Sequence, residues 1–150
     1  MSKKNSSVKK FKKKFQENPR ILDVYNVFKK NISFSKKNLI VVAVSGGADS
    51  LALSALTKFN QYDGNNKYFY VLIDHGYRKK SELEALKVRR MIKTQINENL
   101  IIIKNKQKFK NNLQKNFREI RYKNLFNFCI KKKVKILMTA HHFNDQIETF

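Results

Sequence analysis

The chain has 150 residues, of which 41% are hydrophobic, and its 33 Lys and Arg against 11 Asp and Glu give a formal net charge of +22. This length and apolar content suffice for one domain with a core, and a single cysteine excludes an internal disulfide framework. No apolar run approaches the roughly 18 residues of a membrane span, and the lysine-rich N-terminus lacks the apolar stretch of a secretory signal, so we expect a cytoplasmic protein with no membrane contact.

The basic residues 1–18 come first along the chain, and they have the composition of a flexible, solvated arm. Such an excess of positive charge attracts polyanions and gives salt-dependent association with nucleic acid. The chain is also rich in Lys, Asn, Ile and Phe, which A/T-rich codons encode. The charge alone therefore leaves nucleic-acid binding and codon bias as equally good interpretations.

Residues 19–150 are predicted to form one α/β domain in which strands and helices alternate. A helix is expected to begin at Pro19 with Asn18 as its N-cap, and Ser81 with Glu84 matches a capping box. Continuous apolar runs predict strands that are buried on both faces of a parallel sheet. The strands are predicted at 39–44, 68–73, 100–103 and 134–138, helices at 49–59, from 81 and from about 112, and a turn at 61–66.

Three polar clusters directly follow predicted strands, at residues 45–50, 74–78 and 139–148. In open parallel sheets, ligands bind beyond the carboxyl ends of the strands. We therefore expect all three clusters to meet at one edge of the sheet.

The first cluster combines two adjacent glycines with serines and an acid between a strand and a helix. Glycines allow close approach to a ligand, and main-chain amides followed by a helix N-terminus form an anion site. An acid in such a site indicates a divalent cation between it and the phosphates. The absence of Gly-Lys-Ser/Thr argues against a Walker A loop, and a tight capped turn is the alternative. The cluster consists of Ser45, Gly46, Gly47, Ala48, Asp49 and Ser50.

Four blocks of this sequence together resemble a known enzyme family. "SGGADS" (45–50) matches the SGGxDS loop of the ATP-pyrophosphatase, or PP-loop, superfamily. "IDHGYR" (73–78), "NLQKNFREIRY" (112–122) and "TAHHFNDQIETF" (139–150) resemble blocks of the tRNA(Ile)-lysidine synthetases within it. The resemblance implies a Rossmann-like parallel sheet with helices on both faces. It covers only the N-terminal part of that family, so the domain is expected to be incomplete at its C-terminus.

The resemblance implies a ligase that attaches free L-lysine to C2 of the wobble cytidine in tRNA(Ile) with a CAU anticodon. ATP first adenylates the C2 oxygen and releases pyrophosphate, and the lysine ε-amine then displaces AMP. ATP and Mg²⁺ are the implied cofactors, and a homodimer is left open. We expect the 150 residues alone to bind ATP weakly and to form little lysidine.

Specific side chains are candidates for each role. The resemblance assigns the 45–50 loop to the pyrophosphate portion of ATP, with Asp49 facing Mg²⁺. Arg118 and Arg121 share a helical face, and Arg121 is preferred for the developing phosphate charge because it matches the arginine of the family motif. His141 and Asp145, at i and i+4, suit proton handling. The candidates for contacts with the nucleotide are Asp74, His75 and Arg78, where Asp74 is alternatively a turn cap.

Two alternatives stay open. The first is another PP-loop tRNA-modifying enzyme, a thiolase, against which the lone Cys129 argues. The second is a non-catalytic RNA-binding remnant, since Asn144 stands where the family usually has an aspartate.

Overall fold

The computed structural model describes residues 13, 16–32, 38–64, 66–78, 80–105, 107 and 111–140. Helix α2 precedes a regular alternation of strands and helices, as the sequence predicts. No helix in these ranges is long and apolar enough to cross a bilayer. The elements are α2 (Pro19–Asn31), β1 (Leu39–Ala43), α3 (Ala48–Asp63), β2 (Lys67–Asp74), α4 (Ser81–Ile96), β3 (Leu100–Lys104), α5 (Leu113–Lys131) and β4 (Ile136–Met138).

The described strands form one parallel sheet in the order β3-β2-β1-β4. In this sheet Val41 pairs with Phe69 of β2 on one side and with Leu137 of β4 on the other. The chain therefore moves outward from β1 to β3 and then crosses back through α5 to β4. The strand order therefore switches between β1 and β4. In such sheets ligands bind at this switch point, beyond the carboxyl ends of the two strands. The predicted α/β parallel fold is confirmed.

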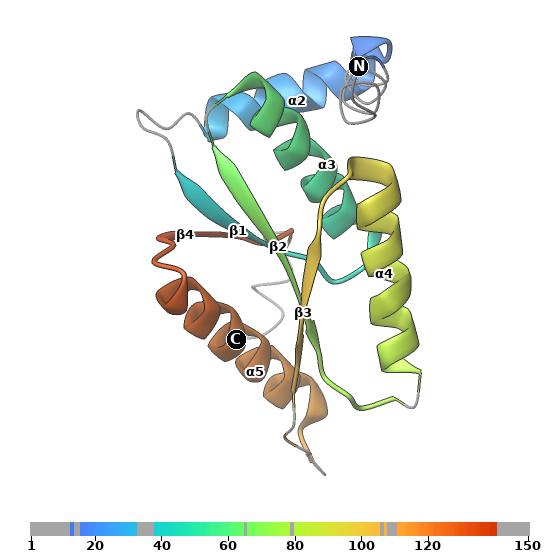
Figure 1. The fold of residues 1–150 in the computed structure, drawn as a ribbon, viewed down its shortest axis with the longest axis vertical. Helices are drawn as coiled ribbons and strands as arrows, with labels where there is room; N and C mark the ends of the chain where they lie inside the picture. Colours follow the sequence, from blue (N-terminus) through green and yellow to red (C-terminus); the bar gives the residue numbers. More distant parts are fainter. Residues whose placement is uncertain are drawn as a thin grey trace.

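Helices cover both faces of the sheet because successive strand residues point to opposite sides. Ile40 and Val42 point toward α3 and α4, where they join Val88 and Ile92 in one core cluster. Val41 points the other way and packs with residues of α5. Figure 1 shows α5 on the opposite side of the sheet from α3 and α4.

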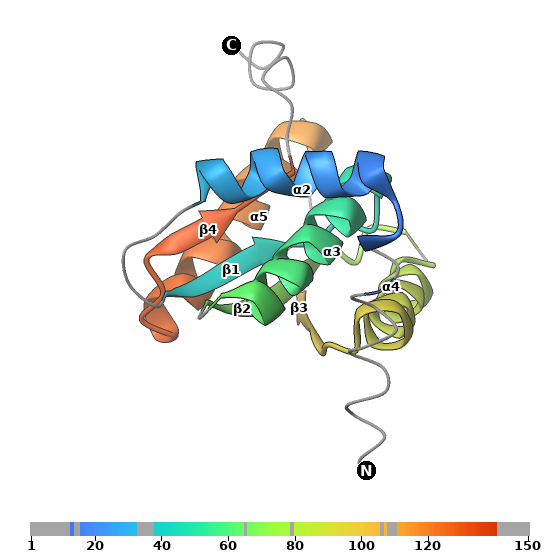
Figure 2. The same ribbon diagram turned by 90° about the horizontal axis from the view of Figure 1, so that it is seen from above.

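Helix α2 packs on α3 rather than on the sheet, as Figure 2 shows from above. The Tyr25 ring meets the Phe59 ring edge-on at 4.6 Å between centroids, and its hydroxyl donates to Asp63 at 3.0 Å. The helix begins as predicted, because Asn18 Oδ1 accepts a hydrogen bond from the amide of Ile21.

The face of α3 toward the sheet is partly polar, which the sequence pattern did not indicate. Ser54 and Thr57 are fully buried, and their hydroxyls donate to carbonyls of the same helix. The Thr57 hydroxyl also lies 3.3 Å from the Tyr70 hydroxyl of β2. Because every polar atom in this contact has a partner, burial costs little.

Two local predictions were wrong. Ser81 is the first residue of α4 and makes no side-chain cap, since the helix starts from Lys80 as N-cap, so the capping box does not form. The predicted turn at 61–66 begins later, because α3 runs on to Asp63 and only ends at Gly64.

Candidate active site

The loop from Ser45 to Ser50 joins β1 to α3 at the carboxyl edge of the sheet, where the sequence placed it. Ser50 closes the loop, since its hydroxyl accepts from the amides of Ser45 and Gly46, both at 3.2 Å, and donates to the Gly47 carbonyl at 2.9 Å. The Ser45 hydroxyl lies 3.1 Å from that of Ser50 and accepts from the Gly47 amide. The two serine hydroxyls therefore hold the loop in one conformation.

Only one of the two glycines is required by the backbone. Gly46 has φ of +90°, and a Cβ there would lie 2.7 Å from a methyl group of Val88 on α4. Gly47 has an ordinary φ of −72° and is the N-cap of α3. The absence of a side chain at Gly46 lets the loop pack closely on Val88 of α4.

The loop offers an anion both hydroxyls and main-chain amides. The amides of Ser45 and Gly46 already bond to Ser50, so a phosphate that used them would displace that hydroxyl. The first turn of α3 adds amides that have no acceptor one turn back in the helix, together with the partial positive charge of a helix start. This geometry is compatible with the predicted phosphate site.

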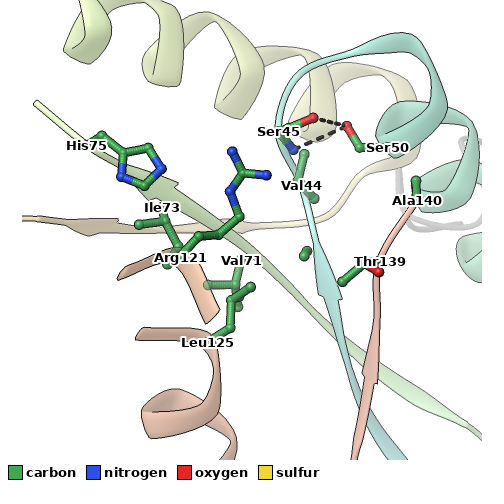
Figure 3. Close-up of a pocket in the computed structure, with 11 residues that line it drawn as sticks. Val44, Ser45, Ser50, Val71, Ile73, His75, Arg121, Leu125, Thr139 and Ala140 are labelled. Atoms are coloured by element: carbon green, nitrogen blue, oxygen red, sulfur yellow. Dashed lines mark hydrogen bonds between the residues drawn. The ribbon is translucent and has the colours of Figure 1, made fainter. Parts of the chain in front are cut away.

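A cavity of about 150 Å³ opens beside this loop at the switch point of the sheet. Its walls come from the ends of three strands and from α3 and α5, as Figure 3 shows. Thr139 and Ala140 of the third polar cluster, which directly follow β4, also line it. The described parts of all three polar clusters therefore meet at this edge. The lining residues are Ala43, Val44, Ser45, Ser50, Val71, Ile73, His75, Arg121, Leu125, Thr139 and Ala140.

Of the two arginines on α5, only Arg121 lines this cavity. Figure 3 shows its guanidinium between His75 and Ser45. Arg118 instead lies with its guanidinium carbon 6.0 Å from the centre of the Tyr122 ring. The geometry thus separates two arginines that sequence spacing alone placed on one face.

His75 is the second polar side chain between the loop and α5. Neither imidazole nitrogen has a hydrogen-bond partner, and both are inaccessible. Burial first and the nearby Arg121 charge second lower the pKa of His75, while Asp74 opposes them, so the ring is neutral at pH 7. Its ring lies 4.8 Å from that of Phe117. This half-buried imidazole with two unused nitrogens is suited to a polar ligand.

Asp74 performs the turn-capping role that the sequence left as its alternative. Its carboxylate accepts from the Gly76 amide at 3.0 Å, and the side chain is buried. It also lines a second cavity, so the cap does not exclude a ligand contact.

The second cavity, of about 410 Å³, lies between the loop after β2 and the starts of α4 and α5. It shares Ser45, Ile73 and His75 with the first cavity, so the two cavities adjoin at these residues. Arg78 lines it, as do Tyr77 and Phe117, whose rings meet edge-on at 5.3 Å. Sequence reasoning assigned Phe117 only to the helix pattern and missed Tyr77, because their meeting depends on how α5 crosses the sheet.

Other predicted residues are not gathered into these cavities. Asp49 lies in the first turn of α3 and is exposed. Within the described ranges, no group of three His, Cys, Asp or Glu side chains is close enough to hold a metal ion. His141, Asp145 and Asn144 lie outside the described residues.

Comparison with known proteins decides the family. The family model described as the PP-loop domain matches residues 9–150. This chain belongs to the PP-loop family. Its membership implies that the domain uses ATP. We call the loop from Ser45 to Ser50 the PP-loop.

Relatives of this PP-loop chain include the tRNA(Ile)-lysidine synthases of Rickettsia rickettsii, 33% identical over 120 residues, and Wolbachia pipientis, 38% identical over 122 residues. Each match covers 80% of this chain but only 24% and 28% of the relative, so the chain spans about a quarter of their length. The U34-tRNA thiolase NcsA from Methanococcus maripaludis has the same fold, with a TM-score of 0.71 at 18% identity, over 83% of this chain and 46% of that one.

Proposed function

We propose that this chain supplies the ATP-binding part of a tRNA(Ile)-lysidine synthetase. The observation that carries the proposal is the cavity at the switch point, where the PP-loop faces the guanidinium of Arg121 and the neutral ring of His75. The identity of 32–38% to enzymes of that name supports this activity over others of the family. The partner is tRNA(Ile) with a CAU anticodon, and free L-lysine is the second substrate.

The reaction has two steps. The C2 oxygen of the wobble cytidine attacks the α-phosphorus of ATP, the bond between the α- and β-phosphates breaks, and pyrophosphate leaves. The neutral ε-amine of lysine then attacks C2, the C2–oxygen bond breaks, AMP leaves, and the amine loses a proton.

The PP-loop and Arg121 would together hold the phosphates during the first step. Ser45 and Ser50 bring hydroxyls to one side of the cavity, and the start of α3 adds partial positive charge. Arg121 approaches from α5 on the other side. Its guanidinium can donate to the α-phosphate oxygens, on which negative charge develops as the cytidine oxygen attacks.

The second cavity would hold the adenosine portion of ATP. It adjoins the first cavity at Ser45, Ile73 and His75, and its wall carries the paired rings of Phe117 and Tyr77. Aromatic faces and an imidazole with two unused nitrogens suit a nucleobase and a ribose hydroxyl. Arg78 at the rim can reach a polar edge of the nucleotide.

Asp49 would hold Mg²⁺ together with oxygens of the phosphates. A single carboxylate is compatible with this ion, which proteins commonly bind through one or two carboxylates and substrate phosphates. The ion would neutralise charge on the pyrophosphate that leaves. Asp49 lies in the first turn of α3, beside the loop that meets those phosphates.

Release of AMP from ATP that requires both tRNA(Ile) and lysine tests this proposal. Because the chain spans only part of the relatives, we expect a low rate, detected with labelled ATP and labelled lysine. Asp49→Ala should abolish the release while tRNA binding stays unchanged. AMP release that does not depend on lysine would contradict the proposal.

A sulfur-transferring enzyme is the second candidate, because the U34-tRNA thiolase NcsA shares this fold. Against it, Cys129 lies on the buried face of α5 in the core, and burial raises the pKa of its thiol, which disfavours the reactive thiolate. Incorporation of labelled sulfur rather than lysine into tRNA would favour the thiolase. Tight tRNA binding without any ATP binding would instead favour a non-catalytic remnant.

A further inference from the structure

The outer face of α4 carries a groove of about 470 Å³ that the proposed reaction does not use. Its cations are Lys80, Lys87 and Arg90, all exposed, and none of them forms an ion pair with another described residue. Leu83 and Leu86 lie between them and are 58% and 45% exposed. We call these residues, with Glu84, the α4 basic groove.

Helical spacing explains why these side chains form one surface. Positions 80, 83, 87 and 90 recur at three and four residues, so they share the face opposite the buried stripe of Val88 and Ile92. Lys80 and Arg90 are separated by about 15 Å along the helix axis. Figures 1 and 2 show α4 at an outer side of the described molecule, so this face is not covered by another described helix.

The groove adjoins the candidate site. Glu84 lines both the groove and the second cavity, and Arg78 lines that cavity close to Lys80 in the chain. A row of cations thus leads away from the cavity along α4. A second copy of this chain is a poor occupant, because the net charge of +22 would repel it.

We infer that the α4 basic groove binds the sugar-phosphate backbone of the tRNA next to the nucleotide that reacts. This inference rests on the proposed function. Lys80, Lys87 and Arg90 would pair with successive phosphates, and Leu83 and Leu86 would contact the sugars between them. Such contacts hold the RNA in register without reading its sequence.

The salt dependence of tRNA binding tests the inference. The double substitution Lys87→Ala and Arg90→Ala removes two cations and keeps good helix formers. The matched control is Lys131→Ala with Lys132→Ala, two exposed lysines at the end of α5, at the opposite edge of the sheet from the site. Binding of a tRNA(Ile) transcript is measured between about 50 and 200 mM salt by fluorescence anisotropy.

The α4 variant should bind less tightly at low salt. The plot of its log K against log salt should be shallower than that of the unchanged protein, by about 1.4–1.8 in slope, because two phosphate contacts are lost. The control should keep the slope of the unchanged protein. Equal losses in both variants would show general attraction by charge, and no loss in the α4 variant would show that the groove does not meet RNA. Either result overturns the inference.

ATP binding, measured on the same variants, separates this inference from the proposed function. The α4 variant should bind ATP as the unchanged protein does, because its two substituted residues line neither ATP cavity. If no variant binds ATP but the tRNA slopes differ as expected, the proposed function fails and the groove stands. If ATP binds and the tRNA slopes of the variants are equal, the inference about the groove fails and the proposed function stands.

Discussion

Gly46 is the residue on which the shape of the PP-loop most depends. Its φ of +90° and the 2.7 Å that would separate a Cβ at this position from Val88 both oppose any side chain. Gly46→Ala should therefore lower the free energy of unfolding by about 1–3 kcal/mol in urea denaturation. Gly47→Ala is the control, because its φ is ordinary and its Cβ would meet only Ser45 Oγ at 3.5 Å. The lower entropy of the unfolded chain and the less favourable N-cap oppose each other, so this substitution should change the free energy of unfolding by less than ~1 kcal/mol. Equal losses at both positions would contradict this interpretation.

His75 should make the stability of the fold depend on pH. Burial and the charge of Arg121 lower its folded-state pKa, Asp74 opposes them, and the unfolded value is about 6.5. Below pH 6.5 the unfolded chain therefore binds more protons than the folded chain. This contribution to stability is complete above about pH 6.5 and declines as the pH falls toward the lower folded-state pKa.

Urea denaturation between pH 5 and 8 measures this effect. The His75→Gln variant, which cannot titrate in this range, should lose less stability on acidification than the unchanged chain. The same pH slope in both proteins would show that His75 is not held neutral by its surroundings.

At the scale of elements, a buried ion pair joins α3 to the turn before β3. The Lys58 side chain is only 6% exposed and donates to Glu98, which is 23% exposed, while its ammonium lies 4.5 Å from the centre of the Tyr62 ring. Glu98→Gln would leave a buried charge without its counter-ion and should cost about 1–3 kcal/mol of unfolding free energy.

A double-mutant cycle of Lys58→Met, Glu98→Leu and the two substitutions together checks this pair. Replacing both groups, as Lys58→Met with Glu98→Leu, should restore most of the lost stability because no buried charge remains. Additive losses in the double variant would show that the two side chains do not stabilise the fold through each other.

The order of strands and helices was predictable, because buried strands appear as continuous apolar runs and the stripe of α4 follows the helical period. The buried polar residues of α3 were not, since Ser54 and Thr57 are satisfied by carbonyls of their own helix. The capping box at Ser81 was also predicted wrongly, because α4 takes Lys80 as its N-cap and Ser81 is already its first residue. Local patterns identify elements, but partners set by three-dimensional contact are not visible in them.

For the whole molecule, the strand order explains why residues far apart in sequence form one site. Strands are added outward from β1 to β3, and the next strand, β4, lies parallel to β1 on its other side. Helix α5 makes the crossing and carries Arg121 to the PP-loop. Sequence spacing predicted that the polar clusters would meet at this edge. It could not predict the second cavity, because the contact of Phe117 with His75 and Tyr77 depends on the path of α5.

The central claim is that ATP phosphates bind between the PP-loop and Arg121, and ATP affinity tests it most directly. Arg121 lines the cavity, whereas Arg118, one turn away on the same helix, lies over Tyr122 and lines neither cavity. Calorimetric titration with ATP should show that Arg121→Ala raises Kd about tenfold or more, as expected for a lost charge-assisted contact, while Arg118→Ala changes Kd less than about twofold. Equal effects of both substitutions, or no effect of Arg121→Ala, would contradict the account.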